Sequence, residues 1–104
     1  MGENTHTIMK NKRYDFEATQ SLAFCSSYGT IRQEKDVKLS VTVGIKDQHS
    51  GWFEIYDIKT GGEVWYAEGG LDFDGMDLVG YDGCFDLPNV IVDKLKELGY
   101  NDEL

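Results

Sequence analysis

The chain has 104 residues, the usual size of one domain, and we expect a single domain over residues 1–104. Hydrophobic residues make up 40% of the sequence and aromatic residues 12%, a composition that excludes a globally disordered protein. The formal net charge of −9 disfavours direct binding to nucleic acid or to an anionic membrane, and it favours basic partners.

The first part of the chain predicts a polar, flexible start over residues 1–12, followed by strand. Apolar and polar residues alternate over Tyr14–Thr19, as in a half-buried strand. The apolar run Leu22–Cys25 fits strand or helix, and we favour strand. Ser26–Gly29 is a turn cluster, and Arg32–Asp36 is expected to be charged and exposed.

The strongest strand signal lies over Val37–Lys46, where five apolar residues alternate with polar ones or glycine. After a loop at Asp47–Gly51, the segment Trp52–Ile58 is apolar on both faces of a second strand. The glycines of Lys59–Gly62 suit a tight connection, and Glu63–Ala67 returns as the partner strand. These segments predict an antiparallel hairpin.

Glycines divide the next part of the chain. Gly69-Gly70 is expected to end the returning strand, with brief pairing at Leu71–Phe73 before a turn at Asp74-Gly75. The segment Leu78–Phe85 is expected to be irregular.

A C-terminal helix is expected to begin with Asp86 as N-cap and Pro88 in its first turn. Gly99 suits its end, and residues 101–104 are expected to be flexible. The fold class is therefore α+β, with an antiparallel sheet of four to five strands and one C-terminal helix packed on it. The apolar stripe of the helix consists of Ile91, Leu95 and Leu98.

The acidity belongs to the second half of the chain, because no lysine or arginine lies between Lys59 and Lys94. A hairpin with large side chains on both faces cannot bury all of them against one helix. Either some of Trp52, Tyr56, Trp65 and Tyr66 are exposed among the acids, or the N-terminal segment covers the second face. Such a surface suits protein binding, although an ordinary solvated face has the same composition. The candidate partner-binding residues are Glu63, Trp65, Glu68, Asp72, Asp74, Asp77, Tyr81 and Asp82.

The acidic turn has a partial resemblance to a calcium-binding EF-hand loop. With Gly75 at loop position 6, Asp72 and Asp74 occupy ligand positions 3 and 5. Gly70 and Tyr81 then occupy positions 1 and 12, where oxygen ligands are required. We therefore predict no EF-hand site and favour a turn whose aspartates accept local backbone hydrogen bonds. A weak cation site of another kind at Asp72, Asp74 and Asp77 is the alternative.

Thiol chemistry is the least favoured function. Cys84 is near the expected helix start, but neither His6 nor His49 has a catalytic motif around it. Cys25 and Cys84 lack CxxC spacing, and the sequence shows no secretory signal or long apolar run. We expect reduced thiols, a cytoplasmic location, no cofactor, no membrane association and no enzymatic activity.

The segment Gly51–Tyr100 resembles small acidic proteins carried by phages and mobile elements, above all at Glu63–Leu71, Tyr81-Asp82-Gly83 and Leu87-Pro88. Such proteins include anti-CRISPR and anti-restriction inhibitors, some of which use carboxylates to mimic the phosphates of DNA. The basic residues of the first half depart from a wholly acidic mimic.

The resemblance implies a non-enzymatic phage or mobile-element inhibitor, which binds a basic, nucleic-acid-binding surface of a host defence protein such as a CRISPR effector. The alternative is a small structural or cation-binding module of a phage or mobile element. The oligomeric state stays open, because an edge strand could pair two copies or be covered by the N-terminus.

Overall fold

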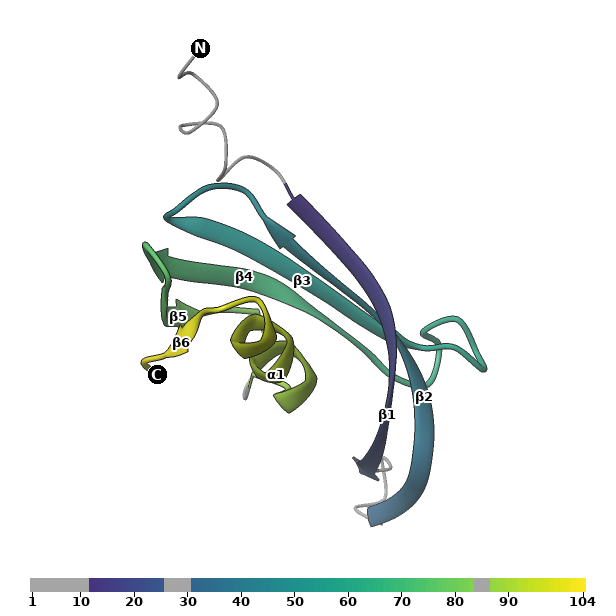
Figure 1. The fold of residues 1–104 in the computed structure, drawn as a ribbon. Helices are drawn as coiled ribbons and strands as arrows, with labels where there is room; N and C mark the ends of the chain where they lie inside the picture. Colours follow the sequence, from purple (N-terminus) through teal and green to yellow (C-terminus); the bar gives the residue numbers. More distant parts are fainter. Residues whose placement is uncertain (1–11, 26–30, 84–86) are drawn as a thin grey trace.

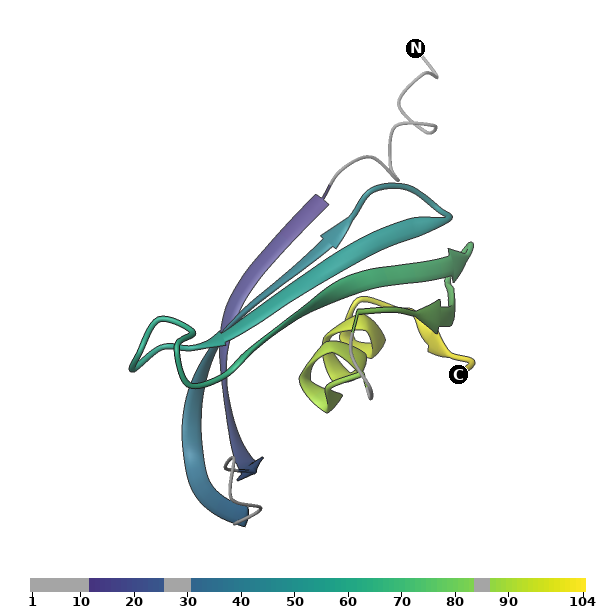
Figure 2. The same cartoon turned by 180° about the vertical axis from the view of Figure 1, so that it is seen from behind.

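The computed structural model describes residues 12–25, 31–83 and 87–104 of the chain. Within these residues, a curled six-stranded sheet holds one helix on its concave side (Figure 1). Seen from behind, the helix again lies on the inner side of the curve (Figure 2). The elements are β1 (Lys12–Cys25), β2 (Ile31–Ile45), β3 (Ser50–Asp57), β4 (Tyr66–Asp74), β5 (Asp77–Tyr81), α1 (Asn89–Glu97) and β6 (Asn101–Asp102).

The strands follow one another in the sheet in the order of the sequence. From β1 to β5 each neighbouring pair is antiparallel, and β6 joins the far edge parallel to β5. The α+β class is therefore confirmed. The expected four to five antiparallel strands were too few, because β6 pairs with β5 through Asn101 N–H to Met76 O (2.8 Å) and Glu103 N–H to Leu78 O (3.0 Å).

A long arm formed by β1 and β2 extends beyond the other strands (Figure 1). β3 pairs with β2 only over Leu39–Ile45, so the earlier part of β2 has β1 as its single neighbour. The register shifts after Gln20, and Asp36 has a positive φ of 56°, which a non-glycine residue rarely adopts. The shift interrupts the pairing of β1 with β2, which resumes in a new register over Leu22–Cys25.

The strand predictions for the arm are largely confirmed. Tyr14–Thr19 and Leu22–Cys25 both lie in β1, while the charged segment Arg32–Asp36 is part of β2. The expected turn at Ser26–Gly29 lies outside the described residues.

The core lies between the concave side of the sheet and α1. The predicted alternation of β2 is confirmed, with its apolar residues from Leu39 to Ile45 at most 4% exposed. Register carries this apolar face across the sheet, since Val43 lies opposite Phe53 and Val41 opposite Ile55. The buried hydrophobic residues are Leu39, Val41, Val43, Ile45, Phe53, Ile55, Leu71, Phe73, Leu78, Leu87, Ile91, Leu95 and Tyr100.

The glycine-rich segment forms strand where the sequence predicted a break and an irregular stretch. β4 runs through Gly69 and Gly70, and β5 occupies Asp77–Tyr81. Pairing with β3 on one side and β5 on the other supplies the hydrogen bonds that override the local preference of glycine. The predicted turn is confirmed at Gly75, which has a φ of 65°.

The helix is confirmed, with its N-cap two residues later than predicted. Asn89 is its first residue and Pro88 occupies the N-cap without a side-chain cap, while Asp86 lies outside the described residues. At the C-terminus, Gly99 has a φ of 101° and the Tyr100 N–H donates to Leu95 O at 2.9 Å.

Asp57 organises the connection between β3 and β4. Its carboxylate accepts bonds from the Thr60 hydroxyl (2.5 Å), the Thr60 N–H (2.9 Å) and the Trp65 N–H (3.0 Å). The Thr60 hydroxyl is the largest contributor, and with the backbone donors it lowers the pKa of Asp57 to about 2. The connection is therefore longer than the predicted Lys59–Gly62 turn, extending to Trp65.

Asp57→Asn is expected to lower the melting temperature at pH 7 by roughly 5–10 °C, because the charged acceptor of these three bonds is lost. The pKa of Asp57 in the folded chain lies below its ordinary value of 3.8. The charged carboxylate therefore stabilises the fold at pH values above 3.8. That stability is lost as the pH falls toward about 2. Thermal unfolding between pH 2 and 7 measures both effects. Asp93→Asn is the control, because Asp93 is exposed. If Asp57→Asn lost as much stability at low pH as wild type does, the stabilising role of the Asp57 carboxylate would be contradicted.

Candidate functional site

The convex side of the sheet carries a concentration of acidic side chains, together with Trp52 and the exposed Tyr66. Alternation along β3 and β4 sends Phe53, Ile55, Leu71 and Phe73 into the core and their neighbours to the convex side. Asp82 follows β5 and accepts a bond from the Gly70 N–H at 2.8 Å. We call the following set the acidic face: Trp52, Glu54, Tyr66, Glu68, Asp72, Asp74 and Asp82.

Two glutamates oppose one another at the centre of the acidic face. Glu54 on β3 lies directly across from Glu68 on β4. The Tyr66 hydroxyl donates to Glu54 Oε2 at 2.9 Å, and the side chain of Tyr66 is 46% exposed. The bond to Glu54, partial burial and the nearby Glu68 raise the pKa of Tyr66 to about 12. The tyrosine therefore stays protonated as a donor to the pair.

Among the residues whose side chains the structure describes (12–21, 35–83 and 87–104), no ion pair involves Glu54 or Glu68. The ion pairs found there are Arg13–Asp15 (3.1 Å) and Lys94–Glu97 (2.5 Å). Like charges directly opposite in a sheet destabilise it. The acidic face therefore has an unmatched negative charge at its centre.

An indole ring lies beside the glutamates. A Cβ atom on Gly44 would lie 2.1 Å from Trp52 Nε1, so the absence of a side chain at Gly44 allows the indole to lie across β2. Where β5 ends, the neighbouring part of β4 borders a hollow of about 540 Å³. The hollow is lined by Trp52, Phe53, Glu54, Glu68, Gly69 and Gly83.

The structure brings only part of the predicted candidate set together. Trp65 and Tyr81 pack against the core, and Glu63 is exposed in the β3–β4 connection. Asp77 accepts a bond from Asn101 Nδ2 at 2.8 Å, beside β6. The candidates that lie on the acidic face are Glu68, Asp72, Asp74 and Asp82.

Sequence reasoning missed Glu54 and did not single out Trp52 or Tyr66 as site residues. The signal was present in the alternation of Trp52, Glu54 and Tyr56 with Phe53 and Ile55. Because β3 is apolar on both faces, the alternation alone did not tell which face the helix covers.

The other chemical candidates gain no supporting geometry. Asp72 and Asp74 lie in strand β4, and the described residues hold no group of three or more His, Cys, Asp or Glu side chains placed to bind a metal. Cys84 and His6 lie outside the described residues, and His49 is exposed in the β2–β3 loop.

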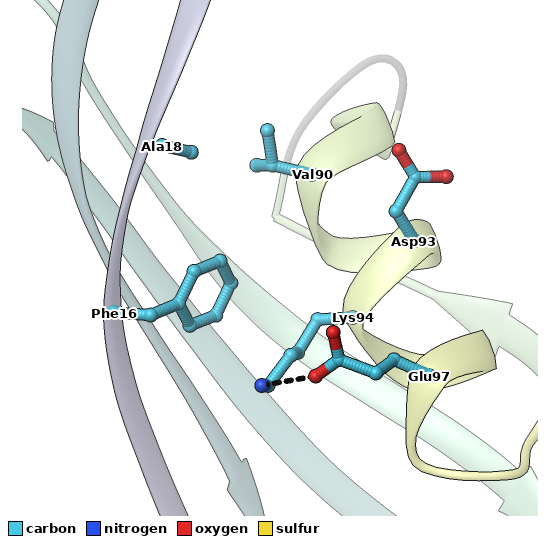
Figure 3. A pocket seen from close by; sticks show the side chains of 6 residues that line it. All are labelled: Phe16, Ala18, Val90, Asp93, Lys94 and Glu97. Atoms are coloured by element: carbon cyan, nitrogen blue, oxygen red, sulfur yellow. Dashed lines mark hydrogen bonds and ion pairs between the residues drawn. The ribbon is translucent and has the colours of Figure 1, made fainter.

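A groove of about 370 Å³ separates α1 from β1 on the concave side (Figure 3). Phe16 faces Lys94 across it, with the Lys94 ammonium 5.1 Å from the ring centroid and 2.5 Å from Glu97 Oε2. Lys94 is thus satisfied by an aromatic face and a carboxylate of the protein itself. The lining residues are Phe16, Ala18, Val90, Asp93, Lys94 and Glu97.

Basic side chains gather elsewhere, at the bend of the arm. A hollow of about 360 Å³ lies between β2 and the start of the β3–β4 connection. None of the residues that line this hollow belongs to the acidic face. The hollow is lined by Lys35, Asp36, Val37, Lys38, Ile58 and Lys59.

In the described part of the chain, the helix is too short and too polar to cross a membrane. No protein-family model, curated protein or solved structure matches the chain, so the assignment of function relies on the acidic face itself.

Proposed function

We propose that the protein is a non-enzymatic interaction protein, which uses the acidic face to bind a basic, nucleic-acid-binding surface of another protein. The observation that carries the proposal is the directly opposed, unneutralised pair Glu54 and Glu68. A lysine or arginine from a partner would offset the repulsion between the two carboxylates. Binding would therefore remove an unfavourable interaction that is present in the unbound protein.

The chemistry around the pair suits an arginine or lysine side chain. Carboxylates offer charge-assisted acceptors, and the Trp52 indole beside them offers a surface for stacking or a cation–π contact. Asp72, Asp74 and Asp82 extend the negative field along the face and would steer a basic partner toward it.

The sequence resemblance to phage and mobile-element inhibitors supplies the proposed class of partner. A protein that binds DNA or RNA must present a basic groove, and a row of carboxylates competes with phosphates for that groove. The partner would then be a host defence protein such as a CRISPR effector. This part of the proposal rests on the resemblance, while the basic character of the partner rests on the acidic face.

The double variant Glu54→Gln/Glu68→Gln is expected to weaken partner binding about 10- to 100-fold, the range for losing close charge pairs at an interface. The chain is immobilised and used to capture proteins from a lysate of its host cell. Partners should be nucleic-acid-binding proteins that duplex DNA displaces. Titration calorimetry on a captured partner then gives the affinity at several salt concentrations.

The matched control is Asp93→Asn/Glu103→Gln, which removes the same charge from α1 and the C-terminal segment, away from the acidic face. The control should bind like wild type. Equal loss in both double variants would mean that only net charge matters, and unchanged binding of the glutamate variant would remove the proposal.

A further inference from the structure

β1 is one edge of the sheet, and no described residue pairs with its outer side. Its regular part, Lys12–Gln20, contains no proline and precedes the register shift. An edge of this length presents free backbone donors and acceptors to another strand.

The hydrogen-bond pattern fixes which residues of β1 face outward. Ile58 N–H donates to Lys38 O, so the backbone of Lys38 points toward β3. Backbone groups alternate in direction along a strand, so Val41 points toward β1, and its partner Phe16 points back. The outward-pointing residues of the regular part of β1 are Arg13, Asp15, Glu17 and Thr19.

We propose that β1 pairs with β1 of a second copy of this chain, antiparallel about a two-fold axis at Asp15, so that two sheets join into one. In this register Arg13 lies opposite Glu17 of the second copy, and Glu17 lies opposite Arg13. Both positions are outward-pointing, so each such pair exchanges two backbone hydrogen bonds. The two ion pairs lie on the convex side.

Neighbouring registers are worse. An axis at Phe16 places Asp15 opposite Glu17 twice, and like charges directly opposite destabilise a sheet. An axis at Tyr14 places Arg13 opposite Asp15, but that carboxylate already accepts bonds from Arg13 Nε and Thr42 Oγ1 of its own chain. The axis at Asp15 instead places Arg13 opposite Glu17, so that each copy contributes one residue of each charge to the pairs.

The contacts of the axis residue also suit this register. Asp15 lies opposite Asp15 of the second copy, but within each chain its carboxylate already accepts bonds from Thr42 Oγ1 (2.7 Å) and Arg13 Nε (3.1 Å). The terminal amino groups of Arg13 stay available to Glu17 of the second copy. On the concave side, Tyr14 lies opposite Phe16 of the second copy, which is a favourable cross-strand aromatic pair.

A two-fold axis perpendicular to the sheet places the acidic faces of both copies on the same side. A dimer would therefore present two such faces together, and a partner with two basic sites would bind with increased avidity. The pairing itself does not depend on what the acidic face binds.

Sedimentation velocity and light scattering from low micromolar to several hundred micromolar protein test the proposal. At physiological ionic strength, salt screens the repulsion between two chains of net charge −9. We expect a reversible dimer of twice the monomer mass of 11.8 kDa. Arg13→Glu or Glu17→Arg alone should raise the dimer dissociation constant about tenfold or more, since two attractive pairs become repulsive.

The double variant Arg13→Glu/Glu17→Arg should restore the dimer, because each ion pair is re-formed with its charges exchanged. Lys46→Glu makes the same charge change as Arg13→Glu outside β1 and should dimerise like wild type. Circular dichroism confirms that each variant is folded. The proposal is wrong if the wild-type chain is monomeric at all concentrations. It is also wrong if the single variants dimerise as tightly as wild type, or if the double variant does not dimerise.

Discussion

Ile55→Ala is expected to lower the free energy of unfolding by about 3–4 kcal/mol, a large part of the stability of a domain of this size. Ile55 is fully buried in β3, between Val41 of β2 and Ala67 of β4. It belongs to the same buried cluster as Ile91 of α1. Both neighbouring strands are held in register by hydrogen bonds, so they cannot move in to fill the cavity.

The same substitution three residues later provides the control. Ile58 lies just beyond β3 and is 39% exposed, so Ile58→Ala should cost less than about 1 kcal/mol. Urea unfolding of both variants, with a shared slope, measures the difference. Similar losses in the two variants would contradict the assignment of the concave side as the buried side of the sheet.

The parts of the fold that the sequence predicted are those where local pattern and tertiary packing agree. The alternation of Val37–Lys46 fixed β2, because one of its faces is apolar and the other mostly polar. The apolar spacing of Ile91 and Leu95 fixed the buried stripe of α1 in the same way. These elements could be identified without knowing their neighbours.

The parts that the sequence did not predict depend on distant partners. β6 consists of two residues with weak local preference, and it forms strand because Met76 and Leu78 accept bonds from Asn101 and Glu103. Such bonds join positions far apart in the sequence. Neither composition nor periodicity of the segment itself carries that information.

The candidate site was predicted by charge and only partly by position. Glu68 and Asp72 were identified because the acidic stretch is visible in the sequence. Trp65, by contrast, packs against the core, while its neighbour Tyr66 is exposed. A shift of one residue along a strand moves a side chain to the other face of the sheet. Where both faces of a strand are apolar, the position of the helix determines which face is buried.

Gly69→Ala is expected to destabilise the protein by about 3 kcal/mol, at the upper end for overpacking a well-packed site. A Cβ atom at Gly69 would lie 1.9 Å from the backbone oxygen of Asp82 and 2.9 Å from Phe53 Cε1. Backbone cannot rotate away as a side chain does. Accommodating the methyl group therefore requires the chain at Asp82 to move and the adjoining end of the β4–β5 pairing to weaken.

Gly70→Ala, the neighbouring position on the same strand, is the matched control. There the added Cβ atom would lie 3.0 Å from Asp82 Oδ1, which can rotate away, so the expected loss is about 1 kcal/mol. Urea unfolding measures both losses, and hydrogen exchange locates them: amides of Asp77–Tyr81 should exchange faster in Gly69→Ala than in Gly70→Ala. A larger loss of stability in Gly70→Ala than in Gly69→Ala would contradict the close approach of the Asp82 backbone to Gly69. The hollow beside Glu68, which Gly69 and Gly83 help to line, would then have a different shape.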